Sequence, residues 1–526
     1  MHRSPRIAVT FLPLLTGCLD TYGSDRPLTT TGEAPEPPPG VTSSSSEPPA
    51  PVTTDPATSD ADDTSTSTGI ADTTDTTATT AEPMTCVESD WSPHVVSFEE
   101  YGANATSYLL SGLAIAENGD LVIAGTSSYP ASYNAFVTKL IFDGTTWHLP
   151  GPPRTFDSIY SSLETMAMDT SGDIYIAGNF YATVWPCHGQ QNPDLCPPDL
   201  SSLTPKNYYD AYVVKLDGTT LDAVWGLQHD SGGTDGALAL TVRDDRVGVT
   251  GYCGGTIDIK ANVLALAIYN DGAVHLSECF AATSSNAAGW ATRWVSDGLA
   301  IAGEFTTSLA LGAPPLTAGS ADVSGFFAAL HPLSLQPQVT PQQFGVVGTN
   351  LVQSMAVLPD GRVALGGSCS GDWLVAGQTC GGDRRPFVLT MDPDGGGLQR
   401  TMLRDDQPGA VLDLHLTPNG ERIVVGGVLS PGAAVIPDLS YALGTGYAAL
   451  LEVDSLEKVR EWTLQGAASQ VRSIVVDPEG GVLFGGTLAK SAEATEWSES
   501  FTAHKAAVPP APREQNTFVI RECIPE

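Results

Sequence analysis

Short apolar runs separated by turn residues recur along the chain. Five stretches share one form, an apolar run, a turn and a second apolar run ending in small residues: AIAENGDLVIAGT, AMDTSGDIYIAGN, MAVLPDGRVALGGS, LHLTPNGERIVVGGV and IVVDPEGGVLFGGT. The turn pairs Asn118-Gly119 and Asp360-Gly361 suit tight hairpins because both central residues tolerate positive φ. The pattern therefore predicts repeated β-hairpins.

The hairpins belong to a longer repeat with a period of about 60 residues. Aligned on the glycine that closes the second run, the units place Gly125, Gly178, Gly251, Gly303, Gly366, Gly426 and Gly485 in equivalent positions. Each unit continues with a third apolar run, and a weaker fourth run carries an aromatic residue at Trp147, Trp225, Phe280, Phe344 or Trp462. Four strands repeated seven times predict an all-β fold, a seven-bladed β-propeller of four-stranded antiparallel blades.

The two ends of the repeat region predict how the ring closes. The chain ends on a third-type run, TFVIREC, so the last blade lacks its outer strand. The segment Pro93–Gly102 reads as a fourth-type strand, and we expect it to pair with residues 517–523. This pairing would remove two open sheet edges, which otherwise invite aggregation.

The repeat resembles the bacterial β-propeller repeat family and, more loosely, the NHL repeat. The resemblance covers about residues 93–526 and implies the propeller fold. It says little about activity, because propellers host many functions. The GG pairs also resemble Kelch repeats, but the Tyr and Trp that follow the glycine pair in that family are missing here.

The first residues have the pattern of a targeting signal. Arg3 and Arg6 precede the apolar run Ile7–Leu15, which is too short to span a bilayer as a helix. The following LLTGC resembles the lipobox of bacterial lipoproteins. That resemblance implies a signal peptide at 1–17, a diacylglycerol on Cys18, and a lipid-anchored protein of the bacterial cell envelope, at the outer membrane or cell surface. The alternative is a general secretion signal with an incidental cysteine.

Residues 18–85 are rich in Thr, Ser, Pro and Asp and have almost no large apolar side chain. Such a segment cannot bury enough surface to offset its chain entropy, so we expect a disordered tether, followed by the propeller domain at 86–526. The formal net charge of −36 argues against nucleic acid as a partner, because nucleic acid requires a basic surface. We expect a monomer.

Cysteine usage indicates an oxidising compartment. Nine cysteines are present, and setting aside Cys18 leaves an even number. Eight cysteines allow 105 pairings, so the pairs are chosen from the expected topology. They are Cys86 with Cys523, Cys187 with Cys196, Cys253 with Cys279, and Cys369 with Cys380.

The chain carries no recognised catalytic, cofactor or metal motif. In GSCSG, Cys369 stands where a nucleophile would, but no neighbouring His suggests activation, and a disulfide is the better interpretation. Cys187, His188 and Cys196 lack zinc spacing, and Met391–Gly397 reads as a turn rather than a calcium loop. Carboxylates that converge from different blades remain an open alternative.

The long loops predict where binding occurs. The second-to-third connections lie on one face of the ring, and several are long. Loops on a rigid scaffold commonly carry function, and aromatic residues are enriched in recognition sites. The candidate ligand-binding residues in these loops are Trp185, Tyr208, Tyr209, Trp373, Tyr441 and Trp497. The alternative is that each packs within its own loop.

These observations predict a non-catalytic module, anchored to the membrane by lipid, that binds a protein or a glycan through the loop-rich face. One alternative is a hydrolase or lyase with carboxylates at the central channel, and another is a structural surface component. Converging carboxylates at the channel would favour the enzyme, an aromatic groove across the loops would favour binding, and a featureless loop face would favour the structural role.

Overall fold

The structure is a computed structural model. It describes residues 94–96 and 107–524, apart from 117, 130–131, 143–146, 157–159, 182, 185, 187–202, 207–208, 245, 257–259, 270, 284–285, 297, 320–321, 346, 373–378, 405, 431–442, 478–479, 492–494, 500–504 and 509–510. All of them belong to one compact unit, Thr80–Glu526. The predicted signal peptide, Cys18 and the tether therefore lie outside the described residues. In the described part of the chain, no helix is long and apolar enough to cross a membrane.

The described residues are all β and form several four-stranded antiparallel sheets. The innermost strands are β2 (Ser107–Ile115), β7 (Ser161–Met168), β11 (Thr234–Arg243), β16 (Ala287–Val295), β22 (Asn350–Val357), β26 (Gly409–Leu416) and the second part of β29 (Lys458–Val476). The second strands are β3 (Leu121–Tyr129), β8 (Ile174–Phe180), β12 (Arg246–Gly255), β17 (Gly298–Phe305), β23 (Val363–Asp372), β27 (Arg422–Leu429) and β30 (Gly481–Ser491).

The outer halves of the sheets follow the same order. The third strands are β4 (Ser132–Phe142), β9 (Asp210–Leu216), β13 (Asn262–Tyr269), β20 (Ser324–Leu330), β24 (Thr379–Met391), β28 (Gly444–Glu452) and β33 (Ala511–Cys523). The outermost are β5 (Trp147–His148) with β6 (Arg154–Phe156), β10 (Ala223–His229), β14 (Val274–Phe280), β21 (Gln342–Phe344), β25 (Gln399–Met402), the first part of β29, and β1 (His94–Val96). Short additional strands are β15 (Ala282–Thr283), β18 (Ser308–Leu309), β19 (Leu316–Thr317), β31 (Thr495–Glu499) and β32 (Lys505–Val508).

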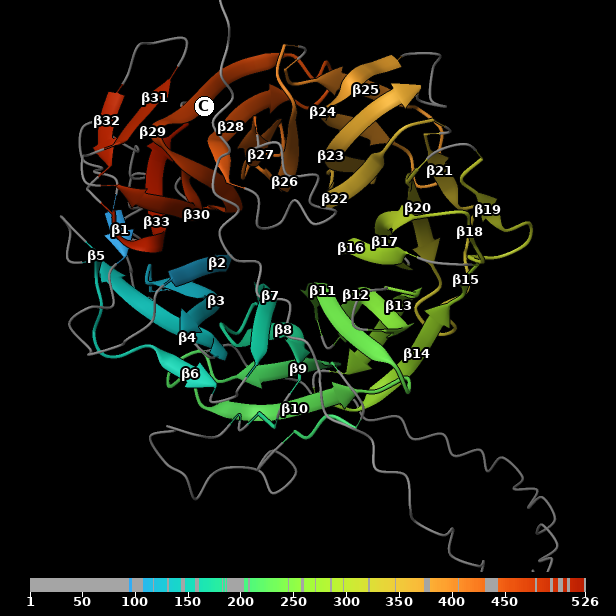
Figure 1. Cartoon of the computed structure of the whole chain (residues 1–526), viewed down its shortest axis with the longest axis horizontal. Coiled ribbons are helices and arrows are strands. Elements are labelled where there is room, and N and C mark those ends of the chain that lie inside the picture. The colour runs from blue at the N-terminus through green and yellow to red at the C-terminus, as the bar shows by residue number, and fades with distance from the viewer. Residues whose placement is uncertain are drawn as a thin grey trace, which may run out of the picture. The chain divides into compact units, whose positions relative to one another are not determined.

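The sheets are arranged around a common centre (Figure 1). Each innermost strand contacts the next one along the chain, and the end of β29 contacts β2. Together these strands line one cavity. The 19-residue strand β29 bends from one sheet into the next, pairing first with β28 and then with β30.

The first described strand lies beside the last. β1 pairs antiparallel with β33, which places Val95 opposite Phe518 and Val96 opposite Thr517. β33 in turn pairs with β30 along most of its length. The described pairing falls within the two segments that the sequence predicted to meet.

Every innermost strand carries a β-bulge at the same place. In β16, for example, the register shifts between Gly289 and Ala291, which leaves Trp290 as the extra residue. The extra residues of the seven strands are Ser111, Glu164, Leu238, Trp290, Gln353, Leu412 and Arg472, and all of them line the central cavity. A bulge bends its strand and redirects a side chain. The bulges therefore direct one residue from each sheet toward the axis.

The glycine that recurs in each repeat accommodates this bulge. At Gly303, an added Cβ would lie 2.0 Å from the carbonyl oxygen of Ala288. The same close approach to a backbone oxygen of the inner strand recurs at Gly125, Gly178, Gly251, Gly367, Gly427 and Gly486. The alignment on Gly366, Gly426 and Gly485 is therefore wrong by one residue, because the second glycine of each GG pair is the equivalent one. The first glycine faces the neighbouring sheet: a Cβ on Gly426 would meet Val471.

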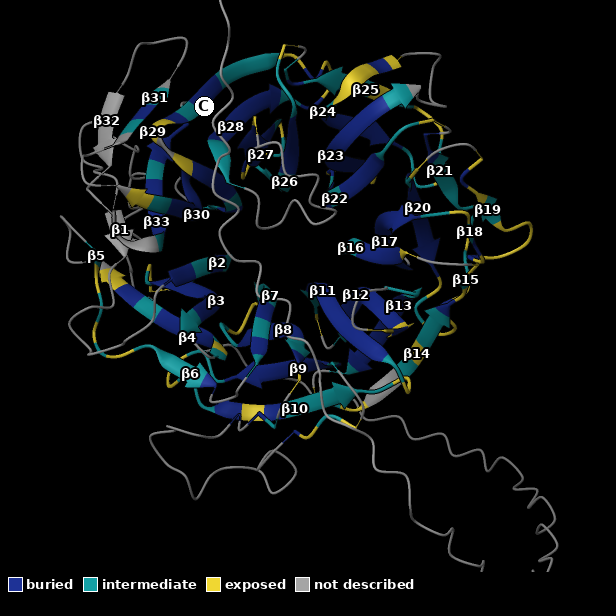
Figure 2. Ribbon diagram, viewed as in Figure 1, coloured by how far each residue is buried: buried dark blue, intermediate teal, exposed yellow. Residues whose placement is uncertain are grey.

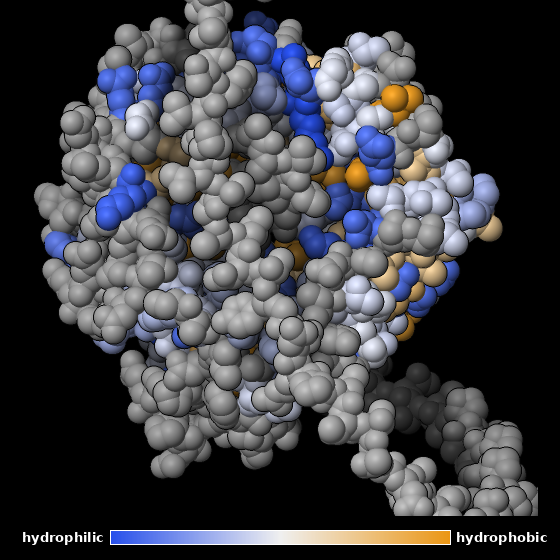
Figure 3. Space-filling model, in the orientation of Figure 1, coloured by the Kyte–Doolittle hydropathy of each residue, from blue (hydrophilic) through white to orange (hydrophobic). Residues whose placement is uncertain are grey.

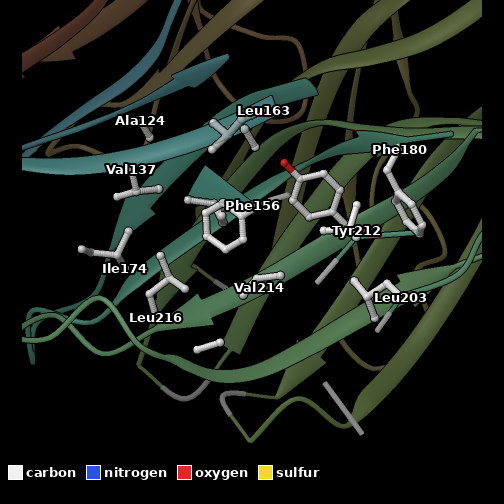
Figure 4. Close-up of a cluster of buried hydrophobic side chains, with 14 of the residues drawn as sticks. Ala124, Val137, Phe156, Leu163, Ile174, Phe180, Leu203, Tyr212, Val214 and Leu216 are labelled. Carbon is white, nitrogen blue, oxygen red and sulfur yellow. The ribbon is translucent and has the colours of Figure 1, made fainter. Parts of the chain in front are cut away.

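Apolar side chains fill the spaces between neighbouring sheets, and the second and third strands are buried along most of their length (Figure 2). One cluster joins the first two sheets through Val137, Leu163, Ile174, Tyr212 and Val214 (Figure 4). Strands covered on both faces lose strict polar and apolar alternation, which explains the continuous runs in the sequence. The predicted outer-strand aromatics Trp225, Phe280, Phe344 and Trp462 are buried as well.

In each of two sheets, a disulfide joins two strands of the same sheet. Cys253 is bonded to Cys279 and Cys369 to Cys380, which are two of the predicted pairs. Cys523 is also disulfide-bonded. Its predicted partner Cys86 and the predicted pair Cys187 and Cys196 lie outside the described residues.

Candidate binding surface and central cavity

The ends of the strands divide the candidate residues between two faces. A strand order of first, second, third and fourth places the second-to-third connections on the same side as the links between sheets. We call this side the loop-rich face. Of the aromatic residues predicted to bind a ligand there, Trp185, Tyr208, Trp373 and Tyr441 lie outside the described residues, whereas Tyr209 and Trp497 are described.

Trp497 does not reach the surface. Its side chain is fully buried, its ring lies 5.6 Å from that of Phe484, and its indole N–H donates to Glu522 Oε1 at 2.7 Å. The prediction of a ligand-binding role is corrected here, because β31 pairs with β29 and folds the indole into the apolar core of that sheet. Trp497 has a packing role.

Tyr209 belongs to a row of aromatic rings on the loop-rich face. Ring centroids are 6.2 Å apart for Tyr133 and Tyr160, 6.2 Å for Tyr160 and Tyr181, and 5.4 Å for Tyr181 and Tyr209. We call these four residues the tyrosine strip. Tyr133 is 46% exposed and Tyr181 is 45% exposed, and they are the two aromatic members of the small set of exposed large hydrophobic side chains in the described chain.

Secondary structure explains why these four rings meet. Tyr133 is near the start of β4, Tyr181 follows β8, and Tyr209 precedes β9, so all three lie where strands end on one face. Tyr160 precedes β7 and forms a parallel bridge with Tyr133, which joins the first two sheets. Burial, with smaller contributions from the neighbouring tyrosines, raises the pKa of Tyr209, so its hydroxyl stays protonated at physiological pH.

Three carboxylates lie next to the strip. Asp210, Asp230 and Asp235 each bring one oxygen atom to within 4.8 Å of the others. Burial raises the pKa of Asp210 to about 6, opposed by the hydrogen bond from Gln228, and assisted by the two other aspartates. Carboxylate oxygens are suitable ligands for a hard cation, so these residues could hold one. The sequence prediction of no metal did not anticipate this cluster, because its members come from three different strand ends.

The same carboxylates also accept hydrogen bonds from the backbone. Asp235 accepts hydrogen bonds from the N–H groups of Ser231 and Gly254, and Asp210 accepts from the N–H of Lys206. Asp210 and Asp235 are fully buried. These two side chains are therefore held within the protein by the backbone groups that they accept from.

Elsewhere on the surface, hydrophobic residues are scattered. Figure 3 shows described hydrophobic and hydrophilic residues interspersed around β15, β18 and β19. Single exposed apolar side chains such as Leu333 are normal and need no partner. The tyrosine strip is different because its members contact one another.

The central cavity has a volume of about 480 Å³ and is lined by residues of all seven innermost strands. Its two carboxylates are engaged by other groups. Glu164 lies 3.4 Å from Arg472, and Asp413 accepts hydrogen bonds from the backbone N–H groups of Leu414 and Ile474. The pair of free converging carboxylates that would favour a hydrolase or lyase is not present in the described lining of the cavity.

Tyr133, Tyr160 and Tyr181 were not predicted as site residues, although each lies beside an apolar run. The available signal was a tyrosine at the end of several strands in adjacent units, SSYPASYNAF, FDSIYSS and IAGNFYA.

The chain was compared with known proteins and solved structures. No family model matches it, and no curated protein matches it. Among solved structures, Sqt1 from Saccharomyces cerevisiae is similar with a TM-score of 0.42 and 8% identity, over 80% of this chain and 99% of Sqt1. Sqt1 from Chaetomium thermophilum is similar with a TM-score of 0.39 and 11% identity, over 73% of this chain and 95% of that one. Likeness at this level has no bearing on function.

Proposed function

We propose that residues 86–526 form a closed seven-bladed β-propeller that acts as a non-catalytic binding module. The seven innermost strands around one cavity support this count, and the pairing of β1 with β33 supports closure by the first strand of the domain. Closure leaves no long sheet edge open to another chain.

The ligand that best fits the loop-rich face is a glycan. The observation that carries this proposal is the tyrosine strip, four rings in contact with two of them nearly half exposed. A tyrosine offers a flat apolar face and a hydroxyl at its tip. Sugar rings present apolar C–H faces and hydroxyl groups, so a row of such rings matches consecutive sugar residues in both properties.

The positions of the carboxylates support the proposal that the module binds its ligand without catalysis. Asp210 and Asp235 are buried, and Glu164 and Asp413 are engaged within the cavity. A hydrolase would need a carboxylate within hydrogen-bond reach of its substrate. Asp235, Asp413 and Glu164 instead form hydrogen bonds or an ion pair within the scaffold on which the strip is presented.

A glycan array probed with the full-length protein tests this function. Tyr181→Ala and Tyr133→Ala should each weaken binding to the best glycan by about ten-fold, which corresponds to about 1.4 kcal/mol. Tyr269→Ala is the matched control, because Tyr269 ends β13 on the opposite face. Binding to a protein array but to no glycan would identify a protein ligand and overturn the glycan proposal. Equal loss in all three variants would remove the strip from consideration.

We propose that Cys18 carries the lipid that attaches the protein to the cell envelope. This rests on the LLTGC motif and on the linker composition of residues 18–85. Several acyl chains on one cysteine would give stable attachment, whereas one chain is marginal. Cells that express the parent should incorporate a palmitate analogue, and cells that express Cys18→Ala should not. Equal labelling of both would defeat the proposal.

A further inference from the structure

The central cavity contains an arginine with few partners. Arg293 lies on β16 among the lining residues, and its guanidinium donates one hydrogen bond, to the carbonyl oxygen of its own neighbour Thr292 at 2.9 Å. Among the described residues, no carboxylate oxygen lies within 4.0 Å of it. An arginine has five N–H donors, so most of its hydrogen-bonding capacity faces the cavity.

The repeat provides an internal comparison for this position. Arg293 lies three residues after the bulge residue Trp290. The equivalent residues in the other innermost strands are Ala114, Ala167, Thr241, Ala356, His415 and Val475. Most are small and none is a lysine or arginine, so the packing of the ring does not require an arginine here.

An arginine in such a place is costly to the fold. It stays protonated at physiological pH, and burial lowers its pKa because the charged form loses hydration. Asp413 attracts it from beyond ion-pair distance but is bonded to the backbone. Arg293 is partly buried, and a partly desolvated charge without a close partner is less favourable than one in an ion pair, so a bound anion would stabilise it.

Two polar atoms beside Arg293 in the ring also lack partners. The Oε1 atom of Gln353 and the Oγ atom of Ser354 are buried without a hydrogen-bond partner, and both residues line the cavity. Ser354 is only 4% exposed. Neither atom has surface open to the cavity, and Ser354 Oγ lies toward Gly366, between two sheets, so a ligand in the cavity does not contact them.

We propose that the central cavity binds a small monocarboxylate, such as a uronic acid, with its carboxylate on Arg293. The planar guanidinium matches a carboxylate through two parallel hydrogen bonds. A single negative charge is favoured because Glu164 and Asp413 also line the cavity and would repel a second one. A volume of about 480 Å³ accommodates a molecule of this size. This site is independent of the tyrosine strip.

Isothermal titration of the full-length protein with D-glucuronate and D-glucose tests the site, because the two sugars differ mainly in the carboxylate. Glucuronate should bind with a Kd of about 1 mM or lower, and glucose at least about ten-fold more weakly. Arg293→Thr, which introduces the residue found at equivalent position 241, should abolish glucuronate binding. Arg246→Thr removes an arginine outside the cavity and should leave binding unchanged.

Thermal unfolding separates a binding role from a structural one. Arg293→Thr should raise the Tm or leave it unchanged, because it removes a partly buried cation without a close partner. A lower Tm would show that Arg293 supports the fold, and would overturn the proposal. So would equal binding of glucose and glucuronate, retained glucuronate binding in Arg293→Thr, or no binding at about 10 mM. Loss of binding in Tyr181→Ala but not in Arg293→Thr would place the sugar on the tyrosine strip instead.

Discussion

The two adjacent glycines of β27 offer a direct test of the bulge geometry. A Cβ on Gly427 would lie 2.2 Å from the carbonyl oxygen of Ala410, which belongs to the backbone of the inner strand. A Cβ on Gly426 would lie 2.8 Å from Val471 Cγ1 and 3.1 Å from Ile474 Cδ1, which are the tips of side chains in the next sheet. The two changes add the same methyl group to the same strand but meet different obstacles.

The obstacles differ in their ability to move. Overpacking a core costs about 1–3 kcal/mol, and a backbone oxygen held by a sheet cannot rotate away as a side chain does. Replacing glycine also restricts the unfolded chain, which stabilises by about 0.4–1 kcal/mol. We therefore expect Gly427→Ala to lower the free energy of unfolding by about 2–3 kcal/mol, and Gly426→Ala by about 1 kcal/mol or less.

Urea unfolding followed by tryptophan fluorescence measures both values, with the shift in midpoint converted through the slope m. Gly382→Ala is the control for an unobstructed glycine, because no atom lies within 4 Å of the position that an added Cβ would take, and its backbone is not left-handed. It should equal or exceed the parent in stability. If Gly427→Ala were as stable as Gly426→Ala, the close approach between β26 and β27 would not exist as described.

Three further predictions concern side chains whose roles the structure defines. Trp497→Phe removes the indole donor to Glu522 and should lower the free energy of unfolding in urea by about 2–4 kcal/mol. A double change with Glu522→Leu should lower it by less than the sum of the two single changes. The pKa of Asp217 is lowered, chiefly by the backbone N–H of Thr220, so Asp217→Asn should destabilise the protein near neutral pH. The loss should shrink as the pH falls below the ordinary Asp pKa of about 3.9 and the carboxylate of the parent becomes protonated. An equal loss across this pH range would refute the prediction. The pKa of Asp210 is raised to about 6 by burial, so the parent loses stability as the pH rises from about 4 to above 6. With EDTA present, Asp210→Asn should have a higher Tm than the parent at pH 7.5 and the same Tm at pH 4.

Local pattern predicted much of the fold. The alternation of apolar runs with Asn-Gly and Asp-Gly turns located the hairpins, because strand and turn preferences act over a few residues. The aromatic residues Trp225 and Trp462 of the fourth runs lie in the outermost strands, as the order of the runs predicted, and both are buried. Two disulfides also follow from the order of strands, since Cys253 and Cys279 lie in the same four-stranded sheet.

The site residues were harder to predict. Tyr209 was identified from its loop, but its neighbours Tyr133, Tyr160 and Tyr181 were not, and Trp497 was assigned to the surface although it is buried. A loop residue faces the solvent or the core according to the strand that its loop forms, and β31 was not visible as an apolar run.

The sequence by itself determined the units of this protein: four short strands, a tight turn and a glycine at the end of the second strand, repeated along the chain. Tertiary structure decided which glycine of a GG pair faces the bulge, which tyrosines form a row, and which arginine is left without an ion-pair partner in the described cavity. The reason is that turn geometry and hairpin hydrogen bonds depend on residues close together in sequence. Which side chains line a cavity or lie on one face depends instead on how sheets that are far apart in sequence are arranged around a common centre.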